Sequence, residues 1–201
     1  KKIGININTS PVLDIIKKKT NKVIGTRSYS INKRIINELG KASVKIYNKN
    51  KIGTVIKHLP GHGSALSDSH KKLPIVKNKY TELSKQDFFC FKGLNSFFGM
   101  TAHILYTAID PKNVSTHSKI VIEKIIRKEI GFKGILISDD ISMKALKYDT
   151  VTNAMKSLQA GCNLALYCGG KHAVSLKLLN IVPFVDKFTI KKTSEFYNFL
   201  S

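Results

Sequence analysis

The sequence predicts an α/β protein built from βα units around a parallel sheet. Short apolar runs rich in Ile, Val or Phe alternate with segments of helical periodicity, and polar or glycine-rich clusters follow the ends of several of these runs. In parallel sheets the carboxyl ends of the strands form the edge at which ligands bind. Loops are polar in any protein, but that alone explains poorly why histidines and paired acids follow successive strands. The pattern therefore favours an enzyme over a bare scaffold.

Five strands are expected, with helices between them. The apolar runs are Ile3–Asn8, Thr54–Leu59, Phe97–Leu105, Gly134–Ser138 and Asn163–Cys168, and the helices are expected at about 31–49, 81–92, 118–130 and 151–160. The third helix has apolar residues at helical spacing, and Gly131 and Gly161 terminate the last two helices. A closed (β/α)₈ barrel needs eight such units and typically about 250 residues. The sequence thus predicts about five units of a barrel-type fold.

Composition limits the class of protein. The chain has 201 residues, 42% of them hydrophobic, which suits one domain with a substantial core. No apolar run approaches the roughly 18 residues that span a bilayer, so we expect no membrane association. The three cysteines, Cys90, Cys162 and Cys168, form no CxxC pair and favour a reducing compartment, hence the cytoplasm. The first residues carry neither methionine nor a signal peptide, which indicates a chain cut from a longer one.

The charge balance is strongly basic. Lys and Arg number 34 against 13 Asp and Glu, a formal net charge of +21. Such a charge could attract nucleic acid, because neutralised phosphates release counterions. However, the lysines are spread along the whole chain, with no nucleic-acid-binding motif and no tryptophan. We therefore expect no nucleic-acid partner and keep nucleic-acid binding as the least favoured alternative.

The densest motif is Lys57-His58-Leu59-Pro60-Gly61-His62-Gly63. Pro60 and the glycines prevent a helix, so His58 and His62 are not the i, i+4 pair of a helical zinc site. No glutamate and no third ligand stand nearby. We therefore expect neither a metal nor a cofactor. The glycines instead allow the backbone of this loop to approach a ligand closely.

Two further motifs carry acids. Asp68 stands two residues before His70, and a carboxylate that accepts from an imidazole favours the protonated ring required of a proton donor. Taken alone, such a pair is more often a surface salt bridge. The apolar run at 135–137 leads into Asp139 and Asp140. One of these acids can cap the next helix or hold a hydrogen-bond network, while the other points into the pocket.

Together these motifs resemble family 3 glycoside hydrolases, specifically the bacterial cytoplasmic β-N-acetylglucosaminidases of peptidoglycan recycling. The resemblance rests on KHLPGHG, DSH and ILISDDISM, and continues through Pro11–Ile15, Arg27–Ser30, Thr101–Ile104 and Ala160–Asn163. It implies that residues 1–201 are a partial catalytic (β/α)₈ barrel. It also implies a nucleophile at Asp139, a general acid/base at His70 with Asp68 as its partner, and sugar-binding groups at Arg27, Lys57 and His58.

The implied activity is that of a retaining exo-β-N-acetylglucosaminidase, with a muropeptide containing N-acetylglucosamine as its small carbohydrate substrate. A carboxylate attacks the anomeric carbon while a second group protonates the leaving oxygen and later activates water. A histidine in that second role would not repel an anionic acceptor, so the residues leave phosphate open beside water. They also leave the oligomeric state open.

The chain departs from the family pattern at two places. The family has an Asp-Gln-Glu-Gly-Gly segment and a following arginine at an earlier strand end, and nothing like it occurs here. The resemblance thus begins at roughly the fourth strand, which predicts N-terminal truncation. Asn163 stands where the family usually has aspartate. An inactive remnant of such an enzyme is therefore the alternative to an active one.

Overall fold

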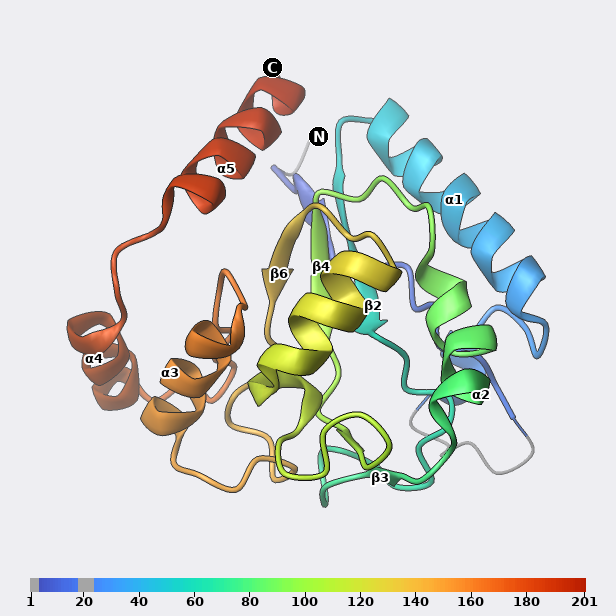
Figure 1. The fold of residues 1–201 in the computed structure, drawn as a ribbon. Coiled ribbons are helices and arrows are strands. Elements are labelled where there is room, and N and C mark those ends of the chain that lie inside the picture. The colour runs from blue at the N-terminus through green and yellow to red at the C-terminus, as the bar shows by residue number, and fades with distance from the viewer. Residues whose placement is uncertain (1–3, 18–23) are drawn as a thin grey trace.

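In a computed structural model, the chain forms a curved parallel sheet surrounded by helices (Figure 1). The structure describes residues 4–17 and 24–201. Four strands lie side by side in chain order: β1 (Ile7–Asn8), β2 (Gly53–Leu59), β4 (Phe98–Thr101) and β6 (Ile135–Ile137). A parallel bridge between Ile137 and Leu164 adds the fifth predicted strand at the edge. Sequential neighbours that are all parallel match a (β/α)₈ barrel of which about five units are present.

Apart from β2, which matches its predicted run, the strands are shorter than predicted. In the predicted run Ile3–Asn8, Ile3 lies outside the described residues and only Ile7–Asn8 pairs with β2. Further along the chain, a single bridge joins Val12 to Lys57 of β2. The predicted run Phe97–Leu105 divides: β4 ends at Thr101, and β5 (Leu105–Tyr106) pairs with β3 (Ile75–Val76) in a separate two-stranded sheet. The run Asn163–Cys168 makes only the one bridge, because within the described chain it lies at the edge of the sheet.

The predicted helices are present, with changed ends. They are α1 (Lys33–Lys49), α2 (Tyr80–Lys85), the helix η4 (Val121–Glu129) and α3 (Thr150–Ala160). The helix expected at 81–92 stops early and resumes as the short 3₁₀ turn η2 (Phe88–Phe91), because Asp87 turns inward to accept the backbone N–H of Ser64 at 2.9 Å. In η4 the hydrogen bonds are of the π type, for example from Ile130 N to Ile125 O at 2.8 Å. Two α-helices of the described residues were not predicted, α4 (His172–Ile181) and α5 (Lys187–Leu200).

Helix ends follow the local sequence. Asn32 caps α1 by accepting from the backbone N–H of Arg34 at 2.9 Å, and Asp149 caps α3 through two backbone N–H groups. Gly161 ends α3 with φ of 115°, a left-handed conformation that glycine adopts without strain. No helix in the described ranges is long and apolar enough to cross a membrane.

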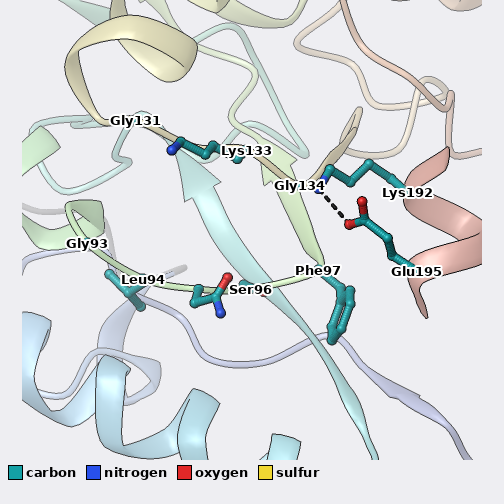
Figure 2. Close-up of a pocket in the computed structure, with 10 residues that line it drawn as sticks. Gly93, Leu94, Ser96, Phe97, Gly131, Lys133, Gly134, Lys192 and Glu195 are labelled. Carbon is teal, nitrogen blue, oxygen red and sulfur yellow. Dashed lines mark hydrogen bonds and ion pairs between the residues drawn. The ribbon is translucent and has the colours of Figure 1, made fainter. Parts of the chain in front are cut away.

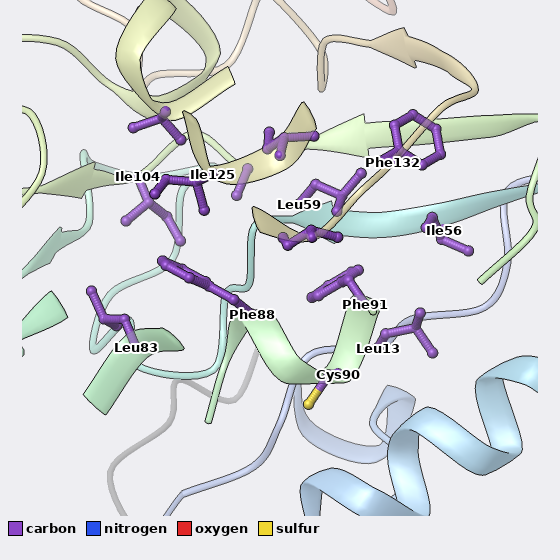
Figure 3. Packing of buried hydrophobic residues seen from close by; sticks show 14 of the residues in the cluster. Leu13, Ile56, Leu59, Leu83, Phe88, Cys90, Phe91, Ile104, Ile125 and Phe132 are labelled. Carbon is purple, nitrogen blue, oxygen red and sulfur yellow. The ribbon is translucent and has the colours of Figure 1, made fainter. Parts of the chain in front are cut away.

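Alternate residues of the strands pack on opposite faces of the sheet, except that the register of β2 shifts between Ile56 and Leu59, which brings both onto one face. On one face Leu13, Ile56 and Leu59 meet Phe88 and Phe91 of η2 together with the apolar side of η4 (Figure 3). On the other face Val55, Phe98, Met100 and Ile135 pack against Phe196 of α5. The first face is the helix-covered outside of the barrel and the second is its interior. This alternation decides which residues at the strand ends point inward.

Candidate active site

Lys57 and Asp139 lie on the barrel-interior face at the carboxyl ends of β2 and β6, the two strands that flank β4. Lys57 follows the interior residue Val55 by two positions in β2, and Asp139 follows Ile137, which also packs on the interior cluster. With a side-chain period of two, both point the same way as these interior residues. Burial lowers the pKa of Lys57, the charge of Arg27 lowers it further, and the carboxylates of Asp139 and Asp14 oppose this. The charges of Arg27, Asp139 and Asp14 therefore each act on the Lys57 ammonium.

Asp139 and Asp140 have different surroundings. Asp139 Oδ1 accepts the backbone N–H of Asp140 at 2.8 Å. The Asp140 carboxylate accepts from Ser142 Oγ at 2.6 Å, from Ser142 N at 3.0 Å and from Cys168 N at 3.1 Å. Burial tends to raise the pKa of Asp140, but these hydrogen bonds hold it below its usual value. Asp140 thus fixes the loop after β6 and ties it to the edge strand.

His103 braces the same loop. It is fully buried, its Nε2 lies 3.0 Å from the carbonyl oxygen of Asp140, and its Nδ1 lies 2.8 Å from Thr116 Oγ1. Burial lowers the pKa of His103, against the opposing charge of Asp139. A neutral ring that donates from Nε2 to the carbonyl and accepts at Nδ1 from the threonine satisfies both contacts. His103 therefore helps to hold the backbone that carries Asp139.

Asp68 and His70 form the predicted pair. His70 Nδ1 lies 2.8 Å from Asp68 Oδ1, which also accepts the backbone N–H of His70 at 2.9 Å. The His70 side chain is 62% exposed. Between them, the carbonyl of Ser69 accepts from Ala145 N at 3.1 Å. This bond attaches the exposed loop to the segment that follows Asp139 and Asp140.

His58 belongs to a buried network that the sequence did not predict. Asp14 is fully buried, and its Oδ2 lies 2.6 Å from His58 Nδ1. Its Oδ1 accepts the backbone N–H of His62 at 2.6 Å. The only feature of the sequence that could have indicated this network is that Asp14 directly follows the apolar residues Val12 and Leu13. The His62 ring packs edge-on against His58 at 5.8 Å between centroids, and both His62 ring nitrogens are buried without a hydrogen-bond partner.

The remaining predicted group, Arg27, ends the short 3₁₀ turn Gly25–Arg27 and is exposed. It contributes its charge to the environment of Lys57. Of the six predicted site residues, two lie near the carboxyl end of β2 (Lys57 and His58), two lie in the loop after β2 (Asp68 and His70), Asp139 follows β6, and Arg27 follows the segment that pairs with β2. Among the described residues, no three His, Cys, Asp or Glu side chains are grouped so as to hold a metal ion.

A cavity of about 200 Å³ lies at the opposite end of the sheet (Figure 2). It is lined by Phe97 and Gly134, the residues directly before β4 and β6, and by Lys192 and Glu195 of α5. None of the predicted site residues lines it. It is therefore separate from the candidate active site.

Comparison with known proteins settles the family. The model of the glycosyl hydrolase family 3 N-terminal domain matches residues 1–194. The chain belongs to glycosyl hydrolase family 3. A β-hexosaminidase of Nitrosomonas eutropha is 35% identical over 175 residues, which cover 84% of this chain and 49% of that protein. A β-hexosaminidase of Methylobacillus flagellatus is 30% identical over 185 residues, covering 89% of this chain and 52% of that protein.

Solved structures of family 3 proteins share the fold. A β-N-acetylglucosaminidase of this family from Paenibacillus sp. str. FPU-7 superposes with a TM-score of 0.86 at 30% identity, over 98% of this chain and 40% of that one. NagZ from Neisseria gonorrhoeae, in complex with N-trifluoroacetyl-D-glucosamine, gives 0.84 at 29% identity, over 96% of this chain and 57% of that one. The chain thus spans about half the length of the curated family 3 relatives it matches.

Proposed function

We propose that this chain carries the catalytic pair of a retaining exo-β-N-acetylglucosaminidase. In this proposal Asp139 attacks the anomeric carbon of a terminal β-linked N-acetylglucosamine, and a covalent glycosyl-enzyme forms as the glycosidic bond breaks. The observation that carries it is the contrast at the end of β6: Asp140 accepts two hydrogen bonds from Ser142 in the loop and one from Cys168 of the edge run, while Asp139 follows the interior positions of the strand. The names of the family 3 relatives support the choice of sugar.

His70 takes the acid/base role in this proposal, and Asp68 holds it. The Asp68 carboxylate accepts from Nδ1, so Nε2 remains to donate to the leaving oxygen and later to accept a proton from water. The bond from Ala145 to Ser69 supports this role, because it keeps the loop beside the segment that follows the nucleophile. Arg27, Lys57 and His58 bind the hydroxyl groups of the sugar.

The natural substrate in this proposal is a muropeptide derived from peptidoglycan, and the location is the cytoplasm. The free thiols support that location, with Cys90 and Cys162 buried and Cys168 exposed. The site already holds the cations Arg27 and Lys57 beside Asp139, and these suit a substrate that carries carboxylates on its peptide. Release of N-acetylglucosamine from a purified muropeptide, compared with release from an uncharged disaccharide, tests this choice.

The first experiment is hydrolysis of a chromogenic β-N-acetylglucosaminide by the wild-type protein and by Asp139→Asn. The amide cannot form the glycosyl ester, so we expect turnover to be abolished with the fold intact. Asp140→Asn is the matched control: it weakens the loop bonds to Ser142 and Cys168 and leaves the attacking carboxylate in place. Normal turnover by Asp139→Asn together with an inactive Asp140→Asn would show that the wrong acid had been chosen.

A further inference from the structure

The buried carboxylate of Asp14 joins three segments of the candidate site. It follows Val12 and Leu13, which pair with Lys57 of β2 through a parallel bridge and a bond from Leu13 N to Lys57 O at 2.8 Å. From there it accepts from the His62 backbone N–H at 2.6 Å and lies 2.6 Å from His58 Nδ1. The backbone nitrogen of His58 lies 3.3 Å from each carboxylate oxygen of Asp14, and its N–H donates to them. Asp14 thus contacts the strand, the histidine at its end and the loop that follows.

The donors around Asp14 determine its charge. Burial works to raise the pKa of Asp14, yet the interactions with His58 and His62 hold it below its usual value. The carboxylate is therefore ionised at neutral pH and accepts hydrogen bonds without donating any. It follows that His58 must carry a proton on Nδ1 to make the 2.6 Å contact. In the neutral ring this leaves Nε2 as an acceptor, so the tautomer of His58 is fixed by its partner.

We propose that Asp14 is a positioning residue for His58, whose imidazole it holds with Nδ1 protonated so that Nε2 is the nitrogen presented to the sugar. This rests on the proposed function, in which His58 contacts the substrate. Loss of a carboxylate that orients a histidine in this way lowers activity even though the carboxylate does not contact the reacting atoms. The reason is that the wrong tautomer presents a donor where an acceptor is required.

A merely structural role for Asp14 must be separated from this one, because the carboxylate also holds the loop through His62 N. Two variants make the separation. Asp14→Asn keeps the size of the side chain but can donate from its amide to His58 Nδ1, which favours the opposite tautomer. Asp110→Asn is the matched control: Asp110 is also buried and accepts from Asn113 N at 3.0 Å and Ser118 Oγ at 2.7 Å, and these partners include no histidine.

The experiment measures kcat and KM for a chromogenic β-N-acetylglucosaminide together with the ¹⁵N chemical shifts of the His58 ring, assigned with His58→Gln. For Asp14→Asn we expect a loss in kcat/KM of at least about tenfold, by analogy with groups that orient metal-binding histidines. We expect Asp110→Asn to stay within about twofold of wild type. In a His58→Ala background, we expect Asp14→Asn to lower kcat/KM by less than about threefold, because its effect passes through the His58 ring.

The shifts test the inference separately from the activity. A protonated Nδ1 and an unprotonated Nε2 in the neutral wild-type ring support it, and the reverse overturns it even if Asp14→Asn fails to fold. Equal losses from Asp14→Asn with and without His58 would also overturn it and leave only a structural role. A wild-type protein that hydrolyses no β-N-acetylglucosaminide would refute the proposed function, while the ring shifts would still decide whether Asp14 fixes the tautomer.

Discussion

His117 should make the protein lose stability in mild acid. Its ring packs beside Tyr148, with 6.4 Å between centroids, and its Nε2 is buried without a hydrogen-bond partner. Burial is the main cause that lowers the pKa of His117 from 6.5 to about 4, and the charges of His103 and Lys156 lower it further. His117 is therefore harder to protonate in the folded protein than in the unfolded chain.

The sign and size follow from this difference. Above pH 6.5 the ring is neutral in both states and has no effect; as the pH falls below 6.5 the unfolded state binds the proton first, and stability declines until about pH 4. At about 1.4 kcal/mol per pH unit, the loss between pH 7.5 and pH 5 is about 2 kcal/mol. Because the ring is partly exposed, solvent screening reduces this to about 1–2 kcal/mol.

The assay is urea unfolding at pH 7.5 and at pH 5, for the wild type and for His117→Phe, which keeps a ring against Tyr148 but cannot titrate. Every other group, including the buried His62 and His103, is common to both proteins. We expect the wild type to lose about 1–2 kcal/mol more than the variant between the two pH values. Equal losses, or a His117 pKa near 6.5 in an NMR titration of the folded protein, would refute the reasoning.

Three further predictions concern the active site, the sheet edge and the chain as a whole. His70→Ala should impair substrates with poor leaving groups far more than activated phenyl glycosides, which depart without the acid's usual contribution of about 10²–10⁴-fold; equal losses would show that His70 only binds the sugar. Asn163→Asp should raise the free energy of unfolding by about 1 kcal/mol in urea titrations at neutral pH, because Asn163 Oδ1 already accepts from Arg127 Nη2 and Leu136 N, each at 2.8 Å, and a carboxylate makes these bonds stronger. Residues 1–201 should self-associate in size-exclusion chromatography, because α4 has no buried residue and Leu179 and Phe184 are exposed; a monomeric protein would contradict this.

Periodicity predicted the parts of the fold that depend on local sequence. The alternation of apolar runs placed β2 and β6, and the apolar spacing followed by glycine placed η4 and α3. It overestimated the edge strand at 163–168, because strand length depends on whether a neighbour supplies hydrogen bonds. It also missed α4, in which no residue is buried and no polar face marks the helix.

The site was predictable to the extent that chemistry shows in the order of the residues. Asp68 and His70 are two residues apart, so their contact needs only a turn, and the sequence motif was enough to pair them. Asp14 and His58 are 44 positions apart. Their contact depends on the parallel bridge between Val12 and Lys57, which no local pattern encodes.

The two adjacent acids show where sequence and structure each contribute. The sequence alone predicts that one of Asp139 and Asp140 caps a helix or holds a hydrogen-bond network while the other faces the pocket, and it does not say which is which. The structure adds the partners: the edge strand supplies Cys168 N and the loop supplies Ser142, and both bind Asp140. An acid with its lone pairs committed to backbone and hydroxyl donors is a poor nucleophile. Asp139 is therefore proposed as the nucleophile because Ser142 and Cys168 bind the other carboxylate. This distinction depends on how the neighbouring segments pack and cannot be read from the two adjacent acids alone.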